Sequence, residues 1–133
     1  MTAQEAAEQA ASLQRELTGL RSRFRLDRDE ARFAALDAEH RTKGFWNPRE
    51  DREKMETWNR LQERLNAFAL ASGEIASLQA VAQLLSEGSD ADLEAEADEI
   101  ARRARRFLAD CRMRLIWSDP DDPCNAIITL HAG

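Results

Sequence analysis

A stripe of apolar residues in the second half of the chain constrains the fold more than any other feature. Its members are separated by four and three positions in turn: Leu93, Ala97, Ile100, Ala104, Phe107 and Cys111. This average spacing of about 3.5 residues is typical of an α-helix that buries one seam against another helix. An upstream stripe also has spacings of three and four residues, which alternate as far as Ile75: Trp58, Leu61, Leu65, Phe68, Ser72, Ile75, Leu78, Val81 and Leu85. Two long helices that pack along one seam are therefore predicted.

The upstream helix has a start signal in the sequence. Asn47 is a capping residue, Pro48 would occupy the first helical position, and Glu50 follows the cap by three residues. No further Pro occurs before Pro120. A helix is therefore expected over 48–86.

The turn between the two helices is short. Gly88 and Ser89 interrupt the apolar spacing, and the downstream helix is expected over 90–117. So short a turn requires the two helices to run antiparallel, as a hairpin. A Gly inside a helix costs about 1 kcal/mol relative to Ala, so a bend at Gly73 is left open.

The N-terminal third adds helical segments to this hairpin. Residues 2–24 carry Leu and Phe at helical spacing, and the acidic stretch 27–30 suits the first turn of a second helical run. Gly44 supplies a C-cap for that run. The pattern allows either two helices or one kinked helix, and it leaves open whether the first helix packs on the hairpin.

The helical pattern stops after Trp117. Two Pro and three Asp make 118–123 a linker, and the β-branched segment 125–131 is predicted to be a strand. The fold class is thus all-α over 1–117, an antiparallel helical hairpin or three-helix bundle. The short strand would belong to the following domain, whose truncated start would cover 124–133.

Composition excludes several classes of protein. The net charge is −6, with 19 Lys and Arg against 25 Asp and Glu, so broad binding to DNA or RNA is not expected, although a single local contact to RNA is compatible with it. The N-terminus lacks the apolar segment of a signal peptide, and no stretch approaches about 20 apolar residues. A cytoplasmic protein without a membrane span is therefore predicted.

Residues that could carry chemistry are few and scattered. Cys111 and Cys124 lack the paired spacing of a zinc site, so a buried apolar Cys111 and an incidental Cys124 thiol are expected. His40 is expected on a solvated helix surface, and His131 at the end of the strand. No catalytic, cofactor-binding or metal-binding residue is predicted.

Two surface features are candidates for contact with partners. The first is the exposed hairpin turn at Ser89 and Asp90. The second is a cluster of four arginines that flank the seam residue Ala104: Arg102, Arg103, Arg105 and Arg106. The alternative for this cluster is a set of ion pairs within the hairpin, with acidic residues of the facing helix: Asp51, Glu56 and Glu63. The three Trp residues are interpreted as core or as the closing base of the bundle: Trp46, Trp58 and Trp117.

Several segments occur in one order between about Phe24 and Gly133. They are the segment Phe45-Trp46-Asn47-Pro48, a capped helix, a hairpin turn and a second heptad helix that ends in Cys111-Arg112-Met113-Arg114-Leu115. An acidic loop follows, and then the closing segment Asn125-Ala126-Ile127-Ile128-Thr129-Leu130-His131-Ala132-Gly133. In this order the chain resembles the N-terminal region of the bacterial peptide chain release factor 2 family.

The resemblance implies a role in translation termination at UGA and UAA stop codons. It also implies docking to the stalk base of the large ribosomal subunit and to the GTPase release factor. The family's codon-reading Ser-Pro-Phe and catalytic Gly-Gly-Gln motifs do not occur in this sequence, so an enzyme is not expected. A monomer is predicted. The alternative is a free-standing coiled-coil adaptor or oligomerisation module, whose seam would pair between chains.

Overall fold

The structure, a computed structural model, describes residues 1–118, apart from the side chains of the last two. This part of the chain contains four α-helices and no strand: Ala3–Arg23 (α1), Leu26–Lys43 (α2), Arg52–Glu87 (α3) and Ala91–Ser118 (α4). The predicted all-α class is confirmed for these residues. The predicted linker beyond Ser118, the strand and the side chain of Trp117 lie outside the described part.

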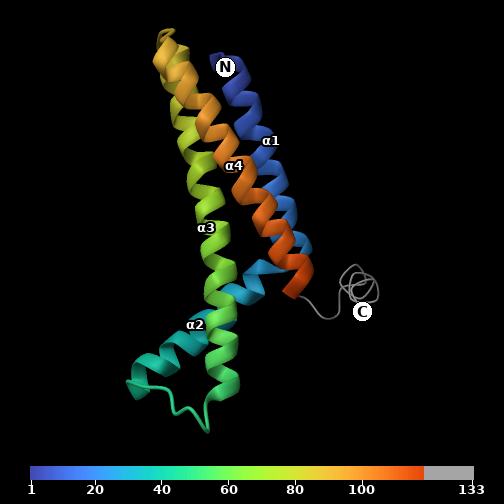
Figure 1. The fold of residues 1–133 in the computed structure, drawn as a ribbon, viewed down its shortest axis with the longest axis vertical. Helices are drawn as coiled ribbons and strands as arrows, with labels where there is room; N and C mark the ends of the chain where they lie inside the picture. The colour runs from blue at the N-terminus through green and yellow to red at the C-terminus, as the bar shows by residue number, and fades with distance from the viewer. Residues whose placement is uncertain (119–133) are drawn as a thin grey trace.

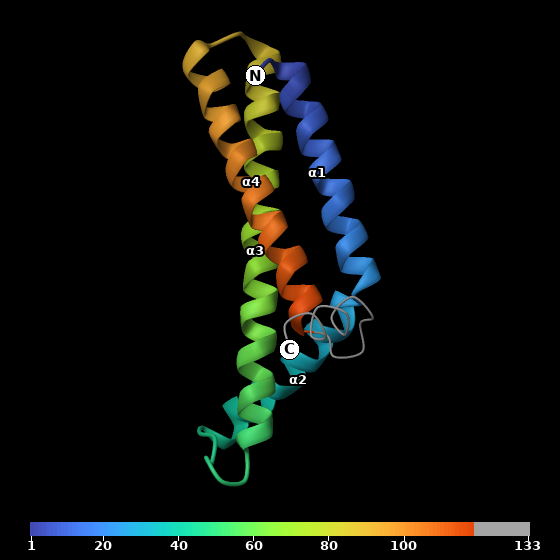
Figure 2. The same cartoon turned by 45° about the vertical axis from the view of Figure 1, so that its right-hand side comes forward.

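Three of the helices form a bundle with an apolar core. α3 and α4 run side by side in opposite directions, and α1 lies along both of them (Figures 1 and 2). We call α1, α4 and residues 65–87 of α3 the bundle. Its core contains fully buried Ile75 and Leu78 from α3 and Ala97, Ala104 and Cys111 from α4. The buried Cys111 confirms the interpretation of that residue as a small apolar side chain.

The N-terminal segment forms two helices rather than one kinked helix. α1 begins with a capping box, in which the Thr2 hydroxyl accepts a hydrogen bond from the Glu5 N–H at 3.2 Å and the Glu5 carboxylate accepts one from the Thr2 N–H at 3.3 Å. α1 and α2 are separated by Arg25, which has a left-handed backbone with φ 52°. α2 then ends at the predicted C-cap, Gly44, which has φ 78° and donates its N–H to the His40 carbonyl at 2.8 Å.

The lower part of the molecule is built from α2 and the start of α3. We call α2, the loop 44–51 and residues 52–64 of α3 the arm, which extends below the end of α4 (Figure 1). The long α3 therefore belongs to both the bundle and the arm. It is continuous through Gly73, without a break in the helix at that residue.

The predicted start of α3 is wrong by four residues. Asn47 caps a turn instead of a helix, because its side-chain oxygen accepts hydrogen bonds from the N–H groups of Arg49 at 2.9 Å and Glu50 at 3.4 Å. The helix itself begins at Arg52, after the buried Asp51. Asp51 turns its side chain back onto the loop, and this contact holds the chain in a turn before the helix begins.

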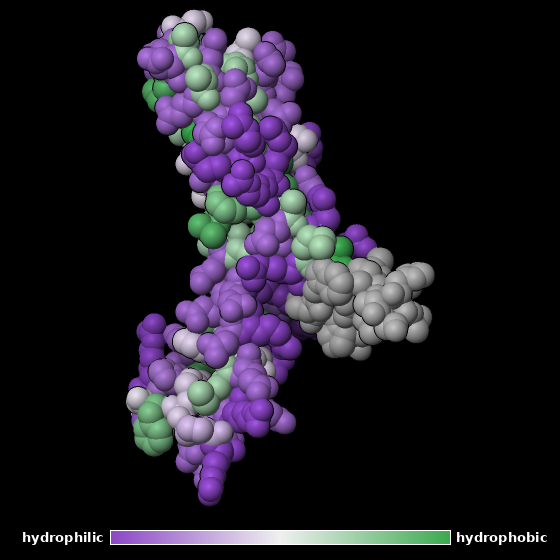
Figure 3. Space-filling view, in the orientation of Figure 1, coloured by the Kyte–Doolittle hydropathy of each residue, from purple (hydrophilic) through white to green (hydrophobic). Residues whose placement is uncertain are grey.

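α3 is long and apolar enough to match a membrane span by length and composition. A core helix of a soluble protein passes the same test, and 39% of the apolar window is buried inside the protein. The face of the molecule in Figure 3 is largely hydrophilic, and its hydrophobic surface occurs in small separate spots.

Candidate functional site

A closed loop forms the lower end of the arm. The carboxylate of Asp51 accepts a hydrogen bond from the N–H of Asn47 at 2.9 Å, and the N–H of Asp51 donates to the carbonyl of Asn47 at 2.8 Å. Lys43 lies 3.4 Å from the same carboxylate. The Asn47 N–H lowers the pKa of Asp51; burial opposes this effect, and Lys43 adds to it. The loop is therefore fixed by a charged group whose partners come from both ends of it.

Above this loop the arm contains a stack of four aromatic rings. Phe33 lies against Trp58 with centroids 5.9 Å apart, and His40 lies 5.8 Å from Trp58 and 5.3 Å from Trp46. His40 is thus half-buried between two indole rings, which corrects its interpretation as a solvated surface residue. Trp58 belongs to this stack and not to the seam of the bundle. Phe45, next to the stack, is 64% exposed.

The predicted arginine cluster lies on α4, and its side chains contact two different neighbouring helices. Arg103 pairs with Glu74 of α3 at 3.3 Å, and Arg105 donates to the Gln9 side chain of α1 at 3.2 Å. Arg102 pairs with Glu99 on its own helix at 2.7 Å. The four side chains therefore do not form one free basic patch.

The partners expected for these arginines in the ion-pair alternative are wrong. Arg103 faces Glu74, and Arg114 lies 3.8 Å from Glu63, which fixes the register of the two antiparallel helices. Glu63 lies eleven residues before Glu74 on α3, which is roughly 16 Å along the helix, so it is too far from Arg103 to pair with it. Glu56 and Asp51 pair instead with Arg52 and Lys43.

The hairpin turn is acidic. Asp90 starts α4, since its carboxylate accepts the Asp92 N–H at 2.9 Å and its carbonyl accepts the Glu94 N–H at 2.9 Å. Ser89 beside it is exposed. No Lys or Arg occurs from residue 65 to residue 101, where eight Asp or Glu occur. We call the end of the bundle around 87–99 the acidic tip.

The junction of α2 and α3 carries the opposite charge. Asp29 of α2 is bound to Arg64 of α3 at 2.6 Å, with both side chains nearly buried at 8% and 12% exposed. Around this pair are four exposed arginines that form no ion pair within the described part of the chain: Arg25, Arg28, Arg32 and Arg60. We call these four side chains the junction arginines.

The junction arginines were not predicted from the sequence. Arg25, Arg28 and Arg32 follow one another at spacings of three and four, a pattern that places them along one side of a helix. That signal was present in the sequence. Its continuation onto α3 at Arg60 depends on the packing of two helices and has no sequence signal.

The described residues contain no group of three or more His, Cys, Asp or Glu that could hold a metal ion. Burial raises the pKa of the Cys111 thiol to about 11, which keeps it protonated and unreactive near neutral pH. The surface of residues 1–118 combines charges of both signs with an exposed aromatic residue, Phe45, at the end of the arm.

The PCRF domain matches residues 29–133. The chain belongs to the PCRF-domain family. Its match begins within α2, so α1 lies outside it. No solved structure matches.

Curated relatives of this PCRF-domain chain are named peptide chain release factor 2. That of Listeria innocua is 30% identical over 89% of the chain and 32% of its own length. That of Lactiplantibacillus plantarum is 31% identical over 68% of the chain and 24% of its own length, and that of Exiguobacterium is 24% identical over 92% and 34%. The predicted resemblance is confirmed, and the chain spans about a third of the length of these relatives.

Proposed function

We propose that the chain takes part in translation termination as the helical N-terminal domain of a peptide chain release factor. The single observation that carries this proposal is the PCRF-domain match over 29–133, together with release factor 2 relatives that align along most of the chain. The stop codons served would be UGA and UAA, and the cytoplasm would be the place of action.

In this proposal the chain binds and positions but does not catalyse. Neither Ser-Pro-Phe nor Gly-Gly-Gln occurs in its sequence, and both would lie in another part of a full-length factor. The docking partners would be the stalk base of the large ribosomal subunit and the GTPase release factor. An elongated surface rich in charge, with an acidic tip and basic side chains elsewhere, is suited to partners recognised electrostatically.

The chain would act as a monomer. The seam residues Ile75, Leu78 and Ile100 are buried within one chain, in a core that α1 completes. A second copy would have to displace α1 to reach that seam. Sedimentation velocity at micromolar concentration tests this point, because the alternative, a coiled-coil oligomerisation module, requires a dimer or larger species.

Binding to ribosomal subunits tests the proposed function. The purified chain would be centrifuged with separated large and small subunits, with serum albumin as the unbound control protein. We expect the chain to pellet with the large subunit and not with the small one. Removal of the stalk-base protein from the large subunit should lower that binding. Equal binding to both subunits, or none to either, would overturn the proposal.

A further inference from the structure

The arrangement of charge along the molecule is uneven. All 19 Lys and Arg lie within 15–64 and 102–114, and eight Asp or Glu occupy the intervening 65–101 without one cation. A polyanion that approaches this molecule is attracted to the α2–α3 junction and to the lower half of α4, and is repelled by the acidic tip. The net charge of −6 therefore conceals a local basic region.

The basic side chains of α4 are largely neutralised within the protein. Arg102, Arg103 and Arg114 each pair with a carboxylate, and Arg112 pairs with Glu16 of α1. A phosphate would have to compete with these carboxylates. Surface ion pairs are worth only about 0–1 kcal/mol, so the competition is not prohibitive, but the local field is reduced.

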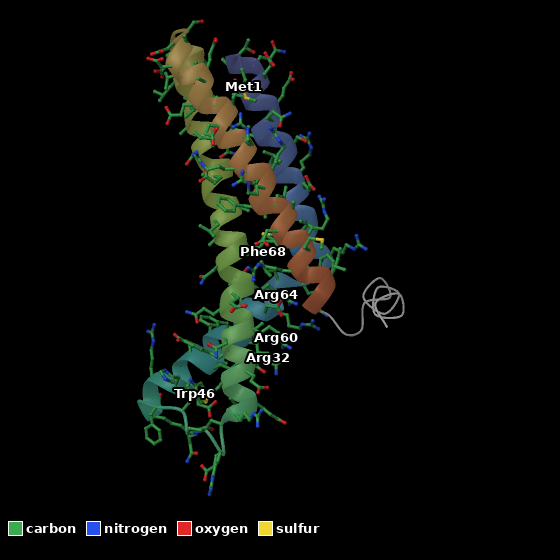
Figure 4. All side chains as sticks on the ribbon, in the orientation of Figure 1. Met1, Arg32, Trp46, Arg60, Arg64 and Phe68 are labelled. Atoms are coloured by element: carbon green, nitrogen blue, oxygen red, sulfur yellow. The ribbon has the colours of Figure 1, made fainter. Side chains whose placement is uncertain are left out.

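The junction arginines are in a different situation. The one buried carboxylate in their midst, Asp29, is occupied by Arg64, and the junction arginines themselves have no carboxylate partner among the described residues. Figure 4 shows Arg64, Arg60 and Arg32 one below another along the junction of α2 and α3. Two helices thus contribute to one row, and a buried ion pair fixes them against each other.

We propose that the junction arginines, Arg25, Arg28, Arg32 and Arg60, form a binding surface for the phosphate backbone of RNA. The row consists only of arginine, whose planar guanidinium matches a phosphate in a two-pronged contact. No aromatic side chain of the stack belongs to the row, so the surface contacts backbone without reading bases. The row extends from the end of α1 across to α3, a shape suited to a strand of phosphates rather than to one isolated anion.

This inference rests on the proposed function for the identity of the RNA, which would be ribosomal RNA of the large subunit. It also assigns an orientation. The junction would face RNA, and the acidic tip would point away from RNA, toward a protein surface or solvent. The hairpin turn at Ser89 and Asp90 is then an unsuitable contact for RNA, because its carboxylates repel phosphate.

A matched pair of triple variants tests the inference. Arg28→Ala, Arg32→Ala and Arg60→Ala remove three junction arginines, whereas Arg102→Ala, Arg103→Ala and Arg112→Ala remove three ion-paired arginines from α4. Both variants have the same net charge, −9 (−6 minus three). All six side chains lie on helices, where Ala is well tolerated, and thermal melting followed by circular dichroism would verify that both variants fold.

Two binding measurements would be made over a series of salt concentrations. The first uses the isolated large subunit, and the second uses a fluorescent RNA hairpin of arbitrary sequence. For the junction variant, the slope of log binding constant against log salt should fall by roughly 2 to 3, about 0.7–0.9 for each phosphate that is no longer neutralised, and binding at low salt should weaken at least tenfold. The α4 variant should keep most of the wild-type slope.

The outcomes separate the inference from the proposed function. Wild-type binding to the hairpin that depends on the junction arginines supports the inference, even if the large subunit does not bind. Large-subunit binding with equal slopes for wild type and junction variant overturns the inference and leaves the proposed function standing. The inference is likewise overturned if the junction variant loses affinity for the isolated GTPase release factor but not for RNA.

Discussion

The described side chains that the bundle buries are all apolar, whereas the arm buries the carboxylates of Asp29 and Asp51 beside the apolar Leu26 and Leu61. In the bundle, side chains of one chemical kind repeat along three helices, and many substitutions of similar volume would preserve the packing. In the arm, each buried carboxylate depends on particular partners, an arginine or a backbone N–H. The bundle therefore depends on a repeated apolar pattern, whereas the arm also depends on individual pairs, so the two should respond differently to mutation.

The largest effect is expected in the core of the bundle. Leu78→Ala should lower the free energy of unfolding by about 4 kcal/mol, because the side chain is fully buried and its removal leaves a cavity. Urea denaturation followed by circular dichroism measures the loss. Leu84→Ala on the same helix is the control: its side chain is 49% exposed, and the change should stay near about 0.5 kcal/mol. Equal losses would show that the apolar core is not what stabilises the bundle.

The arm should be most sensitive at its buried ion pair. Asp29→Ala leaves the guanidinium of Arg64 buried without its carboxylate, at a local cost of roughly 3 kcal/mol. Hydrogen exchange should accelerate in α2 and remain slow in the core of the bundle. The double variant Asp29→Leu with Arg64→Met removes both charges together and should recover most of the stability. Uniform acceleration throughout the chain would contradict a separately stabilised arm.

Two glycines should respond to Ala with opposite signs. Gly44 in the arm has φ 78°, a conformation that costs an L-residue about 1–2 kcal/mol, so Gly44→Ala should destabilise. Gly73 lies inside α3 with open space around the added methyl group, so Gly73→Ala should stabilise by about 0.5–1 kcal/mol. Thermal melts of the two variants measure both effects. A stabilising Gly44→Ala would contradict the C-cap geometry.

The smallest effect is expected from pH. Hydrogen bonding to the Asn47 N–H holds the pKa of Asp51 below 3.8, so this contact adds stability above pH 3.8 that is lost as the pH falls through the folded-state value. Tryptophan fluorescence, which includes Trp46 and Trp58 of the arm, should therefore change at a higher pH than the circular dichroism of the bundle. In Asp51→Asn the difference between the two curves should shrink. If fluorescence and circular dichroism change at the same pH in the unmodified chain, the Asp51 contact does not set the acid stability of the arm.

The bundle was more predictable from the sequence than the arm. The seam residues Ala97, Ile100, Ala104 and Cys111 are buried as their spacing indicates, because helical periodicity records which side faces a core. One member of the upstream stripe differs: Ser72 is exposed and the neighbouring Ala71 is buried. The stripe drifts there around α3, because that helix also packs against α1.

In the arm the periodic pattern indicates less: Leu61 is buried as the upstream stripe indicates, but most contacts of the arm have no such signal. The pair between Asp29 and Arg64 joins residues 35 positions apart, and nothing in the local sequence of either indicates the other. The break between α1 and α2 occurs at Arg25, which is neither Gly nor Pro. The start of α3 was predicted from the capping residue Asn47, but the hydrogen bond between the Asn47 N–H and the Asp51 carboxylate, which depends on the folded loop, delays the helix to Arg52.

The continuity of α3 has a mechanical consequence. This helix is a member of both the bundle and the arm, it has no break at Gly73, and its 36 residues extend roughly 54 Å. Because the helix is unbroken, a displacement of the arm is expected to shift the acidic tip as well, instead of being absorbed at a hinge within α3.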